Sequence, residues 1–353
     1  MQSHRLLHRQ RVVHLLRTSG PLARSDLARI LGVTRSTITA IVSDLVADGT
    51  LVELDHRVDG PNSRGRPRTL LVCNPLVRRV VGIWIDEHHA HIVIADATGN
   101  VSNESHTPVG ERDPYSVIES IVDIGKELMD SPGGPVAAAG ICIPGFVNSA
   151  TGTVDESASP AWSHVTLGQS ISQGLKIPAA VMNTTHALTL AETIAGRARG
   201  ARSAVVLDCG QCIGVGLIID GRPYTGATGT AGVVGSTGGT PLDEPEFSSL
   251  WHAAHRDPPS QNMIRDIVDR IAYTALLIEA IVDPELLIIS GLSSELEELG
   301  SALQSRITEL RPLPRRDRTK TELSHIGREH RVPVIVALQQ LDEDIAALLH
   351  TSS

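Results

Sequence analysis

The segment "LARILGVTRSTITAIVSDLVADG" (residues 27–49) places a short helix, a glycine and a longer helix in direct succession. Each predicted helix has one apolar face, formed by Leu27, Ile30 and Leu31 in the first and by Ile38, Ile41 and Leu45 in the second. Gly32 ends the first helix as a C-terminal glycine does, and Thr34 is a suitable N-cap for the second. This order predicts a helix-turn-helix, with a small helical protein-interaction domain as the alternative.

The opposite face of the second helix carries small and hydroxyl-bearing side chains. Because these side chains are short, this face of the helix fits into the major groove of double-stranded DNA. The residues predicted to contact DNA from this helix are Arg35, Ser36, Thr37, Thr39 and Ala40.

A basic loop follows between two predicted strands, "TLVEL" (50–54) and "RTLLVC" (68–73), with 58–66 as its tip. We expect this hairpin to form a wing. Its basic segment comprises Arg64, Gly65, Arg66 and Arg68. Glycine lets the backbone approach closely and arginines suit a narrow, electronegative minor groove, although a solvated face is the simpler reading of an arginine-rich loop taken alone.

Charge separates this head from the remainder of the 353-residue chain, whose formal net charge is −9. Residues 1–75 hold eleven arginines, no lysine and six acidic residues, a net charge of +5, whereas the rest carries −14. A basic head on an acidic body indicates that the head meets a polyanion.

No apolar run is long enough for a membrane span, the N-terminus is too polar for a signal peptide, and four cysteines do not suggest a disulfide scaffold. A cytoplasmic location is therefore expected.

The body shows one order of elements twice. Three strands (80–86, 90–96, 101–107) precede alternating helices and strands, and strands at 203–209 and 213–219 begin a second such series. That series continues with a helix at 261–282, strands at 285–290 and 332–337, and a final helix at 338–349. We therefore predict an α/β protein: a winged helix-turn-helix (1–75), a first lobe (76–182), a second lobe (183–337) and a C-terminal helix returning toward the first lobe and the head (338–353), with an actin-like, sugar-kinase-like body.

Four segments are similar to motifs of the ROK family (repressors, open reading frames and sugar kinases), in its transcriptional-regulator branch. They are "SRGRPRTLLVCNP" (63–75), "GICIPGFVNSATGTV" (140–154), "GVGLIIDGRPYTGATGTAGVVG" (214–235) and "VDPELLIISG" (282–291). The resemblance implies a homodimer or homotetramer that binds a palindromic operator and responds to a sugar-like effector. It favours a regulator, and a repressor in particular.

The chain departs from the kinases of that family at the catalytic positions. The family's catalytic aspartate corresponds to Thr184, whose hydroxyl cannot act as a general base near neutral pH. Trp84 replaces a phosphate-loop aspartate, and Asp86 and Glu87 stand where glycines would cradle phosphate. We therefore expect no catalytic residue, no cofactor and no kinase activity; His186 as a substitute base is the route by which an active kinase would survive.

Residues that bind the sugar in the kinases of that family are replaced as well. Val233 and Ser236 stand in place of the family's sugar-binding glutamate and histidine, and the segment 236–259 lacks the cysteines of the family's zinc loop. The candidate effector contacts are Asn183, His186 and Trp162. Because so many ligand residues are lost, a constitutive regulator whose body only oligomerises is the main alternative.

Two further clusters leave a redox- or metal-responsive regulator open. Cys209 and Cys212 have redox spacing, but they fall in a predicted strand–strand turn, where small residues also fit for steric reasons. "DEHHAH" (86–91) holds His88, His89 and His91 beside two carboxylates, a set that could bind Zn²⁺ or Ni²⁺ or simply form a solvated turn. The sequence offers no distant partner that would decide for a metal, so no metal ligand is assigned.

Overall fold

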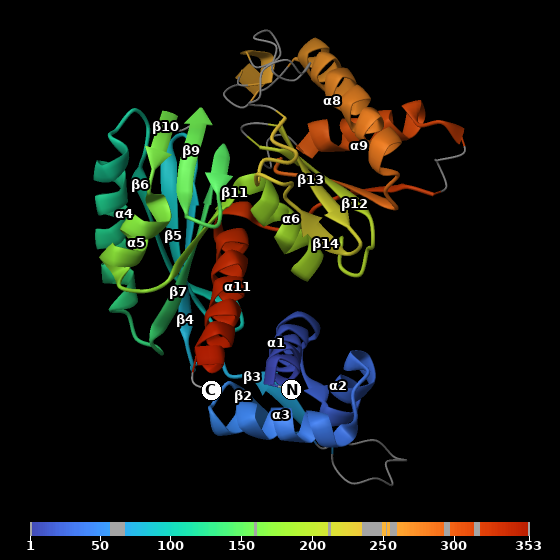
Figure 1. Ribbon diagram of the computed structural model, residues 1–353. Helices are drawn as coiled ribbons and strands as arrows, with labels where there is room; N and C mark the ends of the chain where they lie inside the picture. The colour runs from blue at the N-terminus through green and yellow to red at the C-terminus, as the bar shows by residue number, and fades with distance from the viewer. Residues whose placement is uncertain are drawn as a thin grey trace.

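A basic N-terminal head and two α/β lobes make up the chain in the computed structural model, which describes residues 2–56, 68–158, 161–210, 213–234, 249–251, 253–254, 260–292, 297–313 and 318–351. The two lobes lie side by side, and the head lies below them in the view of Figure 1. The N- and C-termini both lie at the head end of the molecule.

The head is a winged helix-turn-helix, as the sequence predicts. Its elements are α1 (Gln2–Ser19), β1 (Leu22–Ala23), α2 (Arg24–Leu31), α3 (Arg35–Ala47), β2 (Leu51–His56) and β3 (Arg68–Cys73), with the antiparallel strand order β1-β3-β2. Gly32 has a left-handed φ of 66° and ends α2, while the Thr34 side chain accepts a hydrogen bond from the Thr37 amide and begins α3. The wing tip, with Arg64, Gly65 and Arg66, lies outside the described residues.

The first lobe is a five-stranded sheet of order β11-β7-β4-β5-β6, with a small second sheet, β10-β9-β8, beside it. Its elements are β4 (Arg79–Ile85), β5 (His89–Asp96), β6 (Val101–Pro108), α4 (Pro114–Met129), β7 (Val136–Ile143), β8 (Phe146–Asn148), β9 (Thr153–Ala158), β10 (Ala161–Val165), α5 (Leu167–Leu175) and β11 (Ala179–Asn183). Helices α4 and α5 cover the outer face of the large sheet, and its apolar side chains form the core beneath them.

The second lobe repeats this plan with the strand order β14-β13-β12-β15-β16. Its elements are α6 (Thr184–Ala195), β12 (Ala204–Cys209), β13 (Ile213–Ile219), β14 (Arg222–Tyr224), α8 (Gln261–Val282), β15 (Leu286–Ser290), α9 (Glu297–Leu310) and β16 (Lys320–Leu323). In each lobe three antiparallel strands are followed by two parallel ones. The expected duplication of an α/β unit is therefore present.

One predicted strand is wrong. Residues 332–337 belong to a continuous helix, α11 (Arg328–Thr351), and the fifth strand of the second lobe is β16. The run "VPVIVAL" looks like a buried strand because α11 is covered on several sides, by the sheet of the first lobe and by α6, so its apolar residues are not confined to one face. Gly82 and Gly140, cross-strand neighbours on β4 and β7, let the helix lie directly on the sheet.

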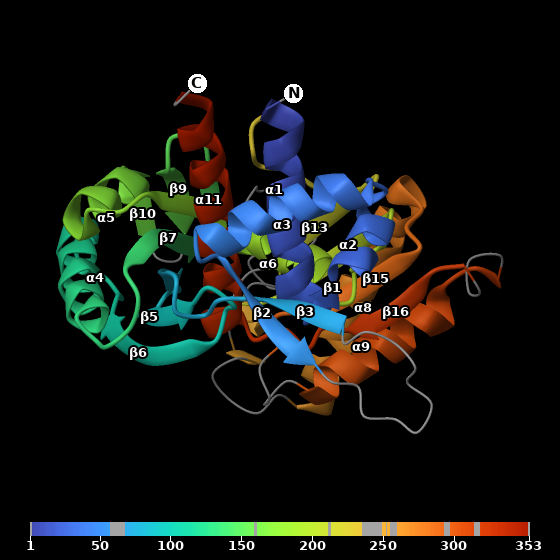
Figure 2. The ribbon, with the colours of Figure 1, turned by 90° about the horizontal axis from the view of Figure 1, so that it is seen from below.

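Helix α11 also reaches the head, where it lies beside α1 (Figure 2). Arg17 of α1 forms an ion pair with Asp342 of α11 at 2.8 Å and donates a hydrogen bond to the Ala97 carbonyl of the first lobe at 2.8 Å. Arg199 of the second lobe donates to the carbonyl oxygen of Thr18 at 2.8 Å. The head thus makes polar contacts with α11 and with both lobes.

No single helix in the described ranges is long and apolar enough to cross a bilayer, and only the bent pair α2 and α3 passes by length and composition together.

Candidate functional site

The exposed face of α3 carries the residues predicted to meet DNA. Arg35, Ser36, Thr39 and Ala40 are exposed, whereas Thr37 is half-buried because its hydroxyl lies 2.8 Å from the Thr34 hydroxyl in the N-cap. The structure thus brings these five residues together on one side of the head. The backbone of Arg68 lies in β3, and its side chain falls outside the described atoms.

Asp44 of α3 and Asp48, the C-cap residue that follows it, are paired with arginines of α1. Arg5 forms an ion pair with Asp44, and Arg9 contacts both Asp44 at 3.8 Å and Asp48 at 2.5 Å. These pairings offset negative charge on the helix that presents the hydroxyl face. An approaching phosphate backbone is therefore repelled less by α3 than its sequence alone would suggest.

A cavity of about 640 Å³ lies between the lobes. Asn183 and Thr184 lie in its wall where β11 passes into α6. The Asn183 amide caps α6: its Oδ1 accepts from the amide of Thr185 at 2.9 Å, and its Nδ2 donates to the carbonyl oxygen of Gly145 at 2.7 Å. Thr184, the first residue of α6, lines the cavity beside it.

A protein guanidinium occupies the second-lobe side of this cavity. Arg328, the first residue of α11, forms an ion pair with Asp208 at 2.9 Å and donates to the Gly291 carbonyl at 2.8 Å. Its guanidinium carbon lies 5.1 Å from the ring centroid of Trp84, within cation–π range. A Cβ at Gly210 would lie 2.1 Å from Arg328, so this glycine makes room for the arginine.

Asp208 is the buried counter-charge of this arginine. Burial raises the pKa of the Asp208 carboxyl, while Arg328 and hydrogen bonds from the Thr185 hydroxyl at 2.9 Å and the Gly210 amide at 3.2 Å act in the opposite direction. The carboxylate is therefore satisfied by the protein itself. No sequence motif singles out Arg328, because only the path of α11 brings it next to Asp208.

The other two candidate effector residues do not line the cavity. His186 is buried and its Nε2 donates to the Ala231 carbonyl at 2.8 Å, which leaves that nitrogen no capacity as a base. Burial also lowers the pKa of His186, so the neutral form is favoured. Trp162 is packed in the core of the first lobe.

Among the described residues, the indole Nε1 of Trp162 and the hydroxyl of its cross-strand neighbour Ser157 are buried without a hydrogen-bond partner. A Cβ at Gly145 would lie 2.7 Å from the Cα of Ser157, so this pair lies close to the carbonyl that Asn183 contacts. The unpaired hydroxyl group of Ser157 therefore lies close to Gly145, which lines the cavity.

The environments of the described cysteines disfavour redox reactions of their thiols. Cys73, Cys142 and Cys209 are all buried with free thiols, and Cys212 lies outside the described residues. Burial raises the pKa of the Cys209 thiol, and the Asp208 carboxylate raises it further. A protonated, buried thiol is a poor nucleophile.

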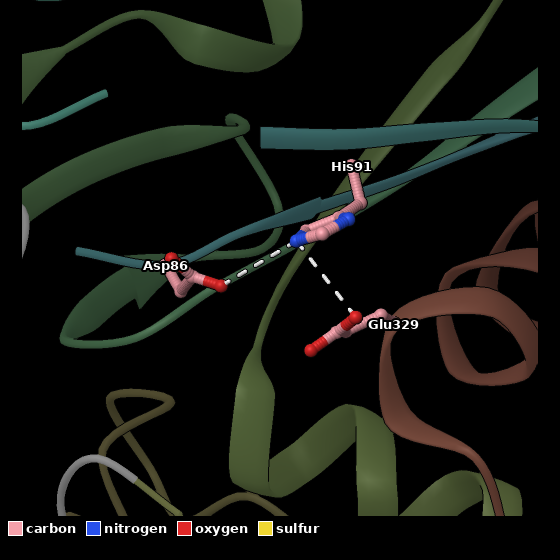
Figure 3. Close-up of side chains that lie close together, drawn as sticks. All are labelled: Asp86, His91 and Glu329. Carbon is pink, nitrogen blue, oxygen red and sulfur yellow. Dashed lines mark ion pairs between the residues drawn. The ribbon is translucent and has the colours of Figure 1, made fainter. Parts of the chain in front are cut away.

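The histidine cluster lies at the first-lobe side of the cavity mouth. His88 and His89 are exposed, whereas His91 points toward Asp86 and Glu329 (Figure 3). Its Nε2 lies 3.9 Å from Asp86 Oδ2 and 3.7 Å from Glu329 Oε2. Glu329 is the distant partner that could not be identified in the sequence.

Comparisons with known proteins agree with this geometry. Residues 80–245 match the ROK family model. Over 245 residues the chain is 27% identical to a xylose repressor of Caldicellulosiruptor bescii, covering 67% of this chain and 60% of that protein. A ROK family transcriptional regulator described as a homolog of the E. coli Mlc protein superposes over 99% of this chain and 100% of its own, with a TM-score of 0.75 and 20% identity.

A ROK family glucokinase from Streptomyces griseus, solved with glucose and AMPPNP, matches 73% of this chain and 98% of its own, with a TM-score of 0.56 and 18% identity. At these identities the structural matches establish the fold alone. The fold is that of a two-lobed, sugar-kinase-like body carrying a winged helix-turn-helix. Residues 80–245 therefore form a ROK domain within the chain. It spans about 60% of the length of the xylose repressor that it matches.

Proposed function

We propose that this protein is a DNA-binding transcriptional repressor whose ROK domain does not phosphorylate sugars. The observation that carries the proposal is the exposed, hydroxyl-rich face of α3 on a basic head that both lobes hold in place. A helix N-terminus with Arg35 and small polar neighbours is suited to base edges and phosphates. The names of the xylose repressor and of other matched relatives support the same role.

Two features of the cavity argue against kinase activity. Thr184 cannot take a proton from a sugar hydroxyl, and Arg328 fills space beside Gly210 and Gly291 in the loops where the resembled kinases hold phosphate. Asp86 adds negative charge to the same cavity. Wild type and Thr184→Asp are both expected to show no ATP-dependent turnover of a hexose panel, because the arginine remains in place.

The cavity supports a small polyol effector in the place of a substrate. Asn183 and Thr184 line it, and the unpaired hydroxyl of Ser157 lies next to Gly145, which is part of its wall. Helix α11 links this cavity to the head, since about 21 Å of helix separates Arg328 from Asp342. An effector that displaces Arg328 would move the helix that holds Arg17.

Self-association is supported by an apolar stripe on α8. Tyr273, Leu277 and Ile281 follow one another at four-residue spacing, and all three are more than half exposed. A dimer or tetramer formed through such a stripe would pair two heads and match a palindromic operator.

A constitutive regulator is the second candidate, and one observation favours it. The polar groups of the cavity are largely satisfied by the protein, with Arg328 on Asp208 and Asn183 committed to the cap of α6. In that case the body would serve oligomerisation alone.

The test is selection of genomic fragments by the purified full chain, followed by titration of the best fragment with sugars and sugar phosphates. An enriched palindromic site that one compound releases is the expected result. A site that is bound but indifferent to every compound would favour the constitutive regulator. Failure to enrich any fragment would contradict the DNA-binding proposal.

A further inference from the structure

We propose that Asp86, His91 and Glu329 form a binding site for one divalent transition-metal ion, with Zn²⁺ as the preferred occupant. The three ligand atoms lie within 4.8 Å of one another and come from two parts of the fold (Figure 3). Asp86 follows β4, His91 lies in β5, and Glu329 lies in the first turn of α11, which arrives from the second lobe.

The donor atoms are held nearly at the spacing that a metal requires. The His91 nitrogen lies 3.9 Å and 3.7 Å from the two carboxylate oxygens. Tetrahedral zinc with ligand bonds of about 2.1 Å needs separations of about 3.4 Å, so small side-chain rotations suffice. Water would complete the fourth position.

Asp86 is oriented by the backbone of its own turn. Its Oδ1 accepts hydrogen bonds from the amides of His88 at 2.8 Å and His89 at 2.9 Å. This arrangement leaves Oδ2 facing His91 and Glu329. Support of this kind, in which one carboxylate oxygen is fixed so that the other can bind, is typical of metal ligands.

The two carboxylates of Asp86 and Glu329 also favour the binding of a cation between them. In the part of the chain that the structure describes, His91 is the sole basic group within 4.0 Å of either carboxylate. A divalent ion would offset the repulsion between two carboxylates that face one imidazole. One nitrogen and two oxygens favour Zn²⁺ over Mg²⁺ or Ca²⁺, which prefer oxygen ligands alone.

The site would connect the first lobe to the start of α11. Glu329 is adjacent to Arg328, whose guanidinium lies in the interlobe cavity. A bound ion would therefore fix the first turn of α11 against the β4–β5 turn. The proposal rests on these contacts alone and does not depend on DNA binding.

The test uses the full chain without an affinity tag, stripped with a chelator and titrated with Zn²⁺ against a chromophoric competitor. We expect one saturable site, weakened at least about 10-fold by His91→Ala and by Glu329→Gln, since each removes one of three ligands. His88→Ala, in the same turn but exposed, is the matched control and should stay within about 2-fold of wild type. Mg²⁺ should not compete at equal concentration.

A second measurement follows backbone amide hydrogen exchange in residues 328–332, the part of the first turns that precedes Pro333. Zn²⁺ should slow exchange there in the wild type and leave Glu329→Gln unchanged. Absence of a saturable site, equal affinity in both ligand variants, or unaltered exchange would overturn the proposal. Loss of binding only in His89→Ala and His106→Ala would also overturn it, because those neighbouring rings would then hold the ion.

Discussion

Replacing Gly140 by alanine tests the packing that positions α11. The new Cβ would lie 2.3 Å from the Ala337 nitrogen and 2.4 Å from the Pro333 oxygen, both backbone atoms of the helix. Ordinary contacts between such atoms are about 3.5 Å, so α11 must retreat from the sheet by about 1 Å. Overpacking of this kind costs about 1–3 kcal/mol.

Thermal unfolding followed by tryptophan fluorescence is the assay. At about 2–4 °C per kcal/mol, Gly140→Ala should lower the unfolding midpoint by roughly 2–12 °C. Gly300→Ala in α9 is the control, because its Cβ would be closest to a leucine side-chain end, 2.8 Å away, which can move. An unchanged midpoint for Gly140→Ala would refute the claim that α11 rests directly on β4 and β7.

Four further predictions follow from single contacts. Arg17→Ala removes the ion pair between α1 and α11, and should raise hydrogen exchange in α1 in the full chain. Leu277→Glu places a charge in the apolar stripe of α8, and should shift the protein toward monomers in sedimentation. Arg311→Ala leaves the buried Glu279 carboxylate, 3.0 Å from the lost Nε, without its partner and should cost about 3–5 kcal/mol in urea unfolding. Burial lowers the pKa of His186 in the folded state from 6.5, so the folded state favours the neutral imidazole. The free energy of unfolding should therefore decrease as the pH falls below 6.5, and the decrease should be smaller in His186→Gln.

The parts of the fold with strong local signals were predictable from the sequence. The head followed from Gly32 and Thr34, because a left-handed glycine and a hydroxyl cap act within a few residues of themselves. Helix α8 has the predicted bounds, 261–282, because Ser260 caps its start and one face is apolar. The antiparallel hairpins also left clear turn signals.

The sequence does not predict the structure correctly where segments that are far apart in the chain pack against one another. Residues 332–337 resemble a strand because β-branched residues buried on several sides lose helical periodicity. Arg328 and Glu329 carried no motif, and their roles depend on α11 crossing from one lobe to the other. Trp162 was expected near the cavity but lies in the core, because β10 pairs with β9 and turns the indole inward.

The central claim is that α3 of this protein binds DNA through its exposed face. The most direct test is the affinity of the selected fragment, at fixed salt, for wild type, Ala40→Glu and the control Ala150→Glu, which adds the same charge at an exposed turn of the body. The account predicts a loss of roughly 100-fold for Ala40→Glu, since a carboxylate would face the DNA surface, and no loss for the control. Equal affinity for all three proteins would contradict it.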